Sequence, residues 1–276
     1  MDVINYSASK SLLTVARGHP YDREAFAALF AGLEDFDVTL VEQPAAQSCL
    51  VPDAADRYDA ILCYDMPGVD FSRGEPVPGV VEPDQGFQDG FLAMLERGMG
   101  MVFMHHALAA WPSWPAYAEV VGGRFHYQPA ELRGEQWPDS GYRHKVEHTV
   151  SVLLDHPVTE GIAGSFEITD ELYLCPVFEG DVVPLLRSDF TFDSEHFYSA
   201  ARAVAGDMNS RQDWQHPPGS SLVGWVKSWG NSPIVYLQCG DDAQAMGNEH
   251  FRRLVHNAVR WVSSEQAHAW ARGEMS

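Results

Sequence analysis

The sequence predicts an α/β fold with a doubly wound, mostly parallel sheet and helices on both faces. The strand candidates, such as residues 58–64 and 99–104, are apolar over most of their length, as expected of parallel strands that are covered on both sides. They alternate with segments of helical periodicity, which is typical of βαβ units. The pattern changes at residues 123–180, where we expect an inserted antiparallel or irregular region packed over one end of the sheet.

The individual elements follow from local signals. The first helix is predicted after Asp22, because aspartate caps helix N-termini, and a later helix is predicted to end at Gly98. Residues 67–83 are rich in proline and glycine, and a connection of this length predicts a functional flap. The predicted strands are 11–16, 37–41, 58–64, 99–104, 182–186, 222–229 and 234–239, with a final helix after Asn248. No linker or repeat interrupts the order, so residues 1–276 are predicted to form a single domain.

The charge balance excludes two classes of partner. The chain has 18 Lys plus Arg against 39 Asp plus Glu, and its formal net charge is −21. Nucleic acid and anionic membranes both bind clustered basic residues, and the longest basic clusters here are pairs such as Arg252-Arg253. We therefore expect no nucleic acid and no membrane as a partner.

Cysteine usage indicates the compartment. The four cysteines are far apart and form no CxxC pair, which is typical of reduced thiols rather than a disulfide framework. No apolar run approaches the ~20 residues of a membrane helix, and the N-terminus does not resemble a signal peptide. The sequence predicts a cytoplasmic protein.

Polar residues follow several predicted strands at the end where α/β sheets bind ligands. His19 follows the first strand, Tyr64 ends the third, His105-His106 follow the fourth, and Asp241 follows the last. The histidine pair is the most informative, since a buried strand that runs into two imidazoles requires partners for them. Adjacent strand residues point to opposite faces, so both can serve one site only if the chain turns sharply. Either one could instead cap the following helix.

Asp170 and Glu171 form the second candidate pair, in an otherwise apolar segment. Two carboxylates in such a segment require partners if they are buried. One interpretation is a metal ligand or a general acid or base; the other, favoured from this segment alone, is a solvated acid at a turn. His144 and His148 in the inserted region either line a site or pack within it, and packing is the preferred interpretation.

The sequence resembles the ThuA-like family of trehalose-utilisation proteins over residues 11–263. The resemblance rests on several motifs in combination, which are His105-His106-Ala107, Trp111, Tyr117, 121–125, 156–162, 170–173 and 223–226. It implies a class I glutamine amidotransferase-like fold, in agreement with the doubly wound prediction. Amidotransferases carry a nucleophilic cysteine at the turn that His105 and His106 occupy here, so amidotransferase activity is not expected.

The family resemblance also implies a function and a ligand set. It implies the handling of disaccharides or their keto derivatives, with a divalent metal held by His105 or His106, by Glu171 and possibly by His19. Imidazoles plus a carboxylate with an open position are the ligands of a catalytic Zn²⁺ site, so zinc is the expected cofactor. The chain departs from the family near His19, where Asp22 stands in place of a second histidine.

Two hypotheses remain open. In the first, the protein is a metal-assisted hydrolase, lyase or isomerase acting on a sugar or keto-sugar, with Asp170 or Asp241 as general acid or base. Tyr64, Trp111 and Tyr173 would then pack against the sugar, although aromatic residues beside proline, as at Trp111, often only pack within a loop. In the second, it is a non-catalytic sugar-binding or regulatory protein. Both predict a small sugar as ligand, and the scaffold is expected to form a homo-oligomer.

Overall fold

The parallel half of the central sheet matches the predicted βαβ pattern. The computed structural model describes residues 4–74 and 77–274. Five neighbouring strands run parallel. Parallel neighbours require a crossover or a longer connection, and each neighbouring pair here is joined by one. In order across the sheet they are β2 (Phe36–Glu42), β1 (Lys10–Arg17), β3 (Ala60–Asp65), β6 (Met101–Met104) and β14 (Ser232–Leu237).

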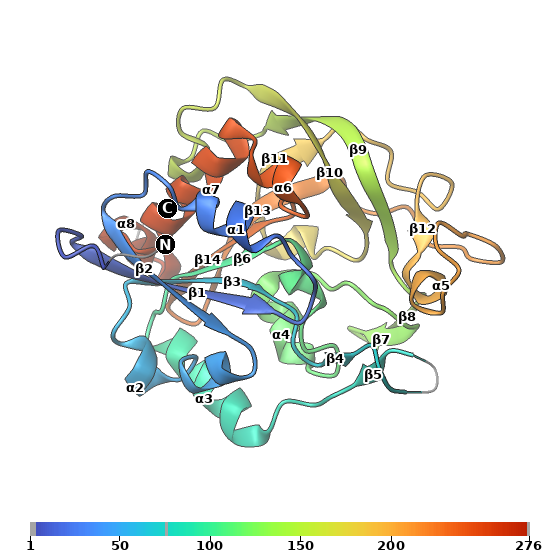
Figure 1. Ribbon diagram of the computed structural model, residues 1–276, viewed down its shortest axis with the longest axis horizontal. Helices are drawn as coiled ribbons and strands as arrows, with labels where there is room; N and C mark the ends of the chain where they lie inside the picture. The colour runs from blue at the N-terminus through green and yellow to red at the C-terminus, as the bar shows by residue number, and fades with distance from the viewer. Residues whose placement is uncertain (1–3, 75–76, 275–276) are drawn as a thin grey trace.

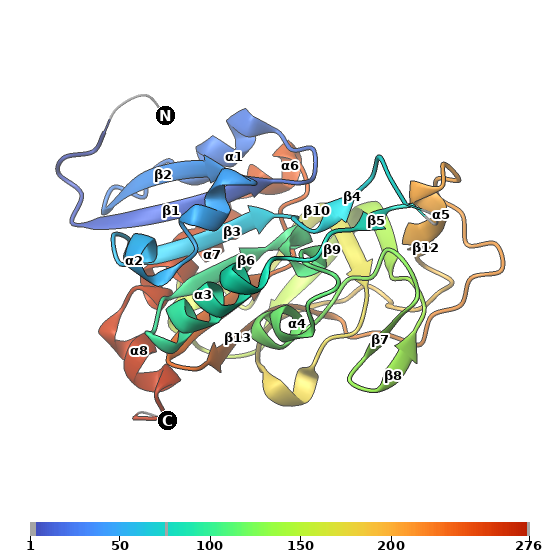
Figure 2. The same cartoon turned by 90° about the horizontal axis from the view of Figure 1, so that it is seen from below.

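Helices cover both faces of this sheet, which confirms the predicted fold class. Successive residues of β1 point to opposite sides, so Leu12 packs in one core with Phe26, whereas Leu13 packs in another with Phe91. Figure 1 shows α1 and α7 above the strands and α2, α3 and α4 below them, and Figure 2 shows α3 and α4 from their own side. The first layer contains α1 (Arg23–Leu29), α6 (Ala243–Met246), α7 (Glu249–Val262) and α8 (Glu265–Ala271), and the second contains α2 (Pro52–Ala55), α3 (Gln85–Glu96) and α4 (Pro115–Val121).

The antiparallel half extends the same sheet. β13 pairs with β14 through a tight hairpin, as predicted, and the order then continues to β11, β9 and β10, with β12 paired to β9. The region expected over one end of the sheet is antiparallel, but its long strands β9 and β10 lengthen the sheet instead of lying across it (Figure 1). The strands are β13 (Leu222–Trp229), β11 (Val183–Ser188), β9 (Gly141–Val152), β10 (Ser165–Leu174) and β12 (Tyr198–Ser199).

Short elements surround the carboxyl ends of the parallel strands. The predicted flap contains a two-stranded hairpin of β4 (Val69–Asp70) and β5 (Gly79–Val80), and residues 75–76 of the flap lie outside the described residues. A second small hairpin joins β7 (Ala130–Leu132) to β8 (Glu135–Trp137), and α5 (Ala200–Val204) follows β12. The short helical turns are η1 (Ala45–Ser48), η2 (His105–Ala109), η3 (Pro157–Thr159) and η4 (Glu179–Asp181).

None of the helices within residues 4–74 and 77–274 has the length and apolar character needed to cross a membrane. The longest of them, α7, has 14 residues and presents arginine and histidine on one side. A spanning helix requires about 20 predominantly apolar residues.

Candidate metal centre

A sharp turn after β6 separates the two adjacent histidines. His105 has φ +50°, in the left-handed region that side-chain-bearing residues rarely adopt, and it begins η2. The hydroxyl of Tyr236 donates to the His105 carbonyl oxygen at 3.0 Å and stabilises this conformation. The two imidazole rings lie 5.5 Å apart with planes at 76°. As a result, only His105 reaches the acidic residues on β10 and after β14.

The ring of His105 is fixed by a backbone carbonyl. Its Nδ1–H donates to the Gln238 carbonyl oxygen at 2.7 Å, so Nε2 faces the other side of the ring. Around Nε2 lie the Tyr173 hydroxyl at 2.8 Å, Glu171 Oε2 at 3.2 Å and Asp241 Oδ1 at 3.6 Å. A carbonyl acceptor on the far nitrogen is the usual arrangement for a histidine that ligates a metal through the near one.

A β-bulge brings Glu171 and His144 to the same place. The register between β9 and β10 shifts between Asp170 and Leu172, so the single residue Glu171 lies opposite both His144 and Lys145. Lys145 has φ +56°, which accommodates the extra residue. His144 Nδ1 then lies 3.3 Å from Glu171 Oε1 and 3.7 Å from Asp241 Oδ2. The sequence favoured a packing role for His144, whereas the structure places it in the site; only the bulge accounts for this, and the sequence gives no clear signal of it.

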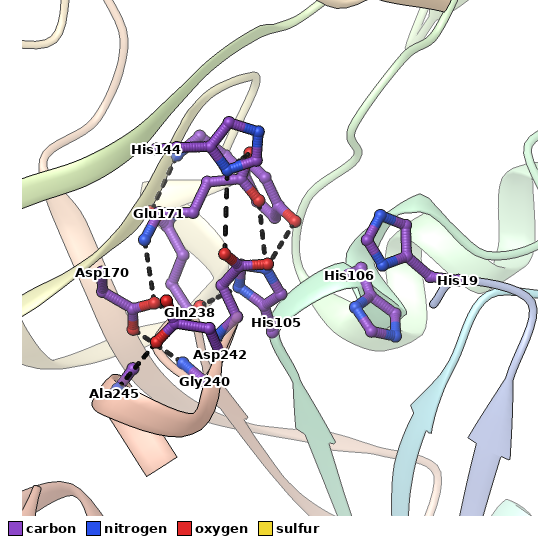
Figure 3. Close-up of polar contacts among 12 residues, drawn as sticks. His19, His105, His106, His144, Asp170, Glu171, Gln238, Gly240, Asp242 and Ala245 are labelled. Carbon is purple, nitrogen blue, oxygen red and sulfur yellow. Dashed lines mark hydrogen bonds and ion pairs between the residues drawn. The ribbon is translucent and has the colours of Figure 1, made fainter. Parts of the chain in front are cut away.

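The two carboxylates therefore connect two imidazoles. One oxygen of Glu171 and one of Asp241 face His105, and the second oxygen of each faces His144. Figure 3 shows His105, Glu171 and His144 gathered in this cluster. His105 is fully buried, while the side chain of His144 is 42% exposed. The cluster is therefore closed to solvent at His105 and open to solvent at His144.

Asp170 holds the turn that presents Asp241. Its Oδ2 accepts from the Gly240 N–H at 2.7 Å, and its Oδ1 accepts from the N–H groups of Asp241 at 3.1 Å and Glu171 at 2.8 Å. Gly240 has φ +118°, so the chain turns sharply here. Asp170 is 1% exposed and uses both oxygens on backbone donors. Asp170, predicted as a general acid or base, therefore has both carboxylate oxygens engaged by backbone N–H groups.

Electrostatic interactions within the cluster favour the protonated form of the two imidazoles and the ionised form of Asp241. Burial lowers the pKa of His105, but its hydrogen bonds to Asp241 and Glu171 outweigh burial and raise that pKa well above the usual value. Burial raises the pKa of Asp241, yet hydrogen bonds from His105 and His144 hold it well below its usual range. The pKa of His144 is raised chiefly by its hydrogen bond to Asp241. A cation held by His105 Nε2 and the two carboxylates would compete with a proton on this nitrogen.

The donor set fits one divalent ion. Ligand atoms of His105, Glu171 and Asp241 all lie within 4.8 Å of one another. Metal–ligand bonds of about 2.0–2.2 Å place neighbouring tetrahedral ligands roughly 3.3–3.6 Å apart. The separations of 3.2 and 3.6 Å from His105 Nε2 to the two carboxylates are close to that spacing.

The other two predicted ligands lie beside this set. His19 donates from Nδ1 to the Pro20 carbonyl oxygen, and its ring is 4.8 Å from that of His106 (Figure 3). His106 donates from Nε2 to the Tyr64 carbonyl oxygen, and its buried Nδ1 has no partner. Burial lowers the pKa of His106 well below the usual value. Neither His19 nor His106 contributes to the three-residue group.

An aromatic cavity of about 180 Å³ opens onto the cluster. Glu171, His144, His19 and Tyr173 lie on its wall, so one of the three predicted sugar-packing residues is in place. Tyr64 is buried and its hydroxyl donates to the Gly240 carbonyl oxygen. Trp111 is buried against Phe87 at 5.4 Å. The remaining residues that line the cavity are Phe71, Phe125, Tyr127, Tyr142, Ala200, Ala203, Val204 and Met208.

The fold and the site define an α/β protein with a histidine–carboxylate cluster at the carboxyl ends of its parallel strands. The chain belongs to the ThuA family, described as trehalose utilisation, whose family model matches residues 14–262. A search of curated proteins found no match.

Solved structures show the same fold. A protein described as ThuA-like from Bacteroides uniformis is 19% identical, with a TM-score of 0.63, over 94% of this chain and 93% of that one. Another, from Parabacteroides merdae, is 16% identical with a TM-score of 0.62, over 92% and 90%. A cytoplasmic protein from Salmonella typhimurium LT2 is 10% identical with a TM-score of 0.54, over 92% and 100%. At these identities the likeness concerns the fold alone.

Proposed function

We propose that this protein is a metal-dependent enzyme that hydrolyses, eliminates or isomerises a disaccharide or a keto-sugar. The observation that carries the proposal is the cluster of His105, Glu171 and Asp241 at the end of an aromatic cavity. Family membership supports the sugar as the substrate class. The cavity suits one sugar ring, since its 180 Å³ is well below the roughly 300–1,000 Å³ of pockets for drug-sized ligands.

His105, Glu171 and Asp241 would hold the ion, and zinc suits one imidazole with two carboxylates. When bound, such an ion supplies Lewis-acid polarisation of a sugar oxygen. Asp170 and Gln238 contribute indirectly, because the first holds the turn before Asp241 and the second fixes the ring of His105. We place neither His19 nor His106 among the ligands.

His144 is the group best placed to move a proton. Its ring lines the cavity, and Nδ1 contacts both carboxylates, which orient the ring. It is the exposed member of the cluster, so substrate and solvent both reach it. Of the predicted aromatic contacts, we assign only Tyr173 to the sugar, because its ring lines the cavity and its hydroxyl lies 2.8 Å from His105 Nε2. Asp241 then serves as a ligand.

We propose that the protein is cytoplasmic, acts on a small-molecule sugar and forms a homo-oligomer. The net charge of −21 is consistent with a partner set that includes neither nucleic acid nor an anionic membrane surface.

Turnover of sugars tests the enzyme hypothesis. Metal-loaded protein is incubated with trehalose and with keto-disaccharides, and products are followed by NMR. The proposal predicts product from the parent and from His250→Ala, a control on α7, and a loss of at least about 100-fold in His105→Ala. Saturable sugar binding without product would instead support the non-catalytic alternative.

A further inference from the structure

His19 is the second imidazole on the wall of the cavity that opens onto the metal centre. It follows β1, whereas His144 lies on β9, and Figure 3 shows the two rings on either side of His105. The chain turns sharply before His19, because Gly18 has φ +105° and a Cβ there would lie 2.4 Å from the Met66 carbonyl oxygen. Glycine allows this close approach, which carries His19 from the end of β1 to the cavity.

A hydrogen bond determines which nitrogen of the neutral His19 ring carries the proton. Nδ1 lies 2.9 Å from the Pro20 carbonyl oxygen. A carbonyl oxygen can only accept, so the proton is on Nδ1 and Nε2 carries a lone pair. The ring also packs against that of His106 at 4.8 Å, and His106 is in turn bonded to the Tyr64 carbonyl oxygen. These contacts orient the His19 ring.

Nε2 of His19 is available to a ligand. Within residues 4–74 and 77–274 it has no hydrogen bond or ion pair, and it is not one of the polar atoms buried without a partner, unlike Nδ1 of His106. Burial and then the nearby His105 lower the pKa of His19 below its usual 6.5. Glu171 and Asp241 act in the opposite direction without reversing this shift. The imidazole is therefore neutral at pH 7, and Nε2 can accept a proton.

A free base beside a metal centre suits the removal of a proton from carbon. A bound ion lowers the pKa of its own water to about 7, so the water needed for hydrolysis is already activated there. A hydrogen on carbon is far less acidic, and its removal requires a separate base even when the neighbouring ketone is polarised. His19 presents such a base on the wall of the cavity, outside the three-residue ligand group.

We propose that His19 is the base that removes the proton from the carbon beside the ketone of a keto-sugar bound in this cavity. The C–H bond breaks, its proton moves to Nε2, and its electron pair forms the C=C bond of an enolate as the ketone oxygen takes the negative charge. The Pro20 carbonyl oxygen, bonded to Nδ1–H, stabilises the imidazolium that forms. This inference rests on the proposed function and narrows its reaction to elimination or isomerisation, which both begin with this step.

Exchange of carbon-bound hydrogen for deuterium tests this role. The probe is methyl glucopyranoside oxidised to a ketone at carbon 3, which leaves a hydrogen-bearing carbon on each side of the carbonyl. Zinc-loaded protein is incubated with the probe in D₂O, the two neighbouring protons are followed by NMR, and calorimetry measures binding. The parent is expected to catalyse the loss of at least one of these proton signals.

Two variants locate the base. His19→Gln keeps a polar side chain without a basic nitrogen, and should slow exchange at least about 100-fold while the affinity for the probe changes less than about twofold. His250→Gln is the matched control on α7, outside the cavity, and should exchange like the parent.

Equal exchange rates in His19→Gln and the parent would overturn the role of His19 alone. So would binding without exchange in the parent, release of methanol with both protons retained, or a loss of affinity in His19→Gln as large as its loss of exchange. Failure of the probe to bind the parent would overturn the proposed sugar function as well.

The tautomer of His19 gives a measurement that requires no turnover. Nitrogen-15 NMR of the metal-free, histidine-labelled protein at pH 8 should show the His19 ring, identified by its absence from His19→Gln, with its proton on Nδ1. A proton on Nε2 would leave no lone pair for the substrate and would overturn the assignment.

Discussion

Replacing Asp170 by asparagine removes the charge that holds the turn before Asp241 while it preserves the shape of the side chain. The carboxylate accepts three backbone N–H groups, from Gly240, Asp241 and Glu171. An asparagine keeps one acceptor oxygen, so its NH₂ group must face one of these donors. Burial raises the pKa of Asp170 to about 6, and the carboxylate is therefore ionised at pH 8, where the comparison is made.

The expected loss follows from these contacts. One buried N–H loses its partner, which costs about 1–3 kcal/mol. The remaining two hydrogen bonds become neutral and weaken, since charge-assisted bonds are roughly twice as strong. Relief of the burial that raises the pKa of Asp170 offsets part of this loss, although Asp170 has three backbone donors to lose, so we expect Asp170→Asn to lower the free energy of unfolding at pH 8 by about 1–2 kcal/mol. Because Asp241 moves with the turn, zinc affinity is expected to fall roughly 10- to 100-fold.

Urea unfolding of the metal-free protein measures the first quantity, and competition with a chelator measures the second. Glu167→Gln is the matched control, because Glu167 lies on the same strand and is exposed; it should change stability by less than about 0.5 kcal/mol. A stability loss as small as the control's, together with unchanged zinc affinity, would refute the positioning role of Asp170.

Two further predictions concern the fold. Asp65 is fully buried, and burial raises its pKa to about 6, although the Gln43 amide donates to its carboxylate at 2.6 Å. Because the pKa of Asp65 is higher in the folded than in the unfolded protein, the stabilising contribution of Asp65 is present below about pH 4. It is lost as the pH rises through 6. Asp65→Asn should therefore be more stable than the parent by about 1–3 kcal/mol at pH 8 but not at pH 4, and equal stabilities at pH 8 in urea titrations would disprove this. A Cβ on Gly100 would lie 2.0 Å from the Val262 carbonyl oxygen, so thermal unfolding should show a loss of about 2–3 kcal/mol in Gly100→Ala. Gly180→Ala, with no atom within 4 Å of the added Cβ, should change little, and equal losses in both variants would contradict the packing argument.

The fold was predictable because its signals are local and redundant. β3 and β6 are buried over their whole length, and the apolar sequences of β6 and of the part of β3 before Asp65 indicate it directly. The antiparallel half was harder to place, since β9 alternates like an edge strand and gives no indication of which strand it pairs with. Whether it lies across the sheet or extends it depends on pairing with β11, a contact between distant segments.

The sequence predicts which edge of the sheet carries the site, but not which side chains form it. The rule that parallel strands end together placed His105 and Asp241 near one another, as the structure shows. The choice between His105 and His106 depends on one residue with φ +50°. His144 reaches the site through a bulge whose positive φ falls on Lys145, a lysine that gives no signal of it in the sequence. Backbone conformations of this kind depend on tertiary packing.

Metal content is the most direct test of the candidate centre. Untagged protein is equilibrated with zinc, manganese and ferrous iron, passed through a desalting column and measured by inductively coupled plasma mass spectrometry, in parallel with His105→Ala, Glu171→Gln and the control His250→Ala. The proposed site predicts about one divalent ion per chain in the parent and the control, and its loss in the two site variants. No bound ion in the parent, or a full complement in His105→Ala and Glu171→Gln, would contradict it.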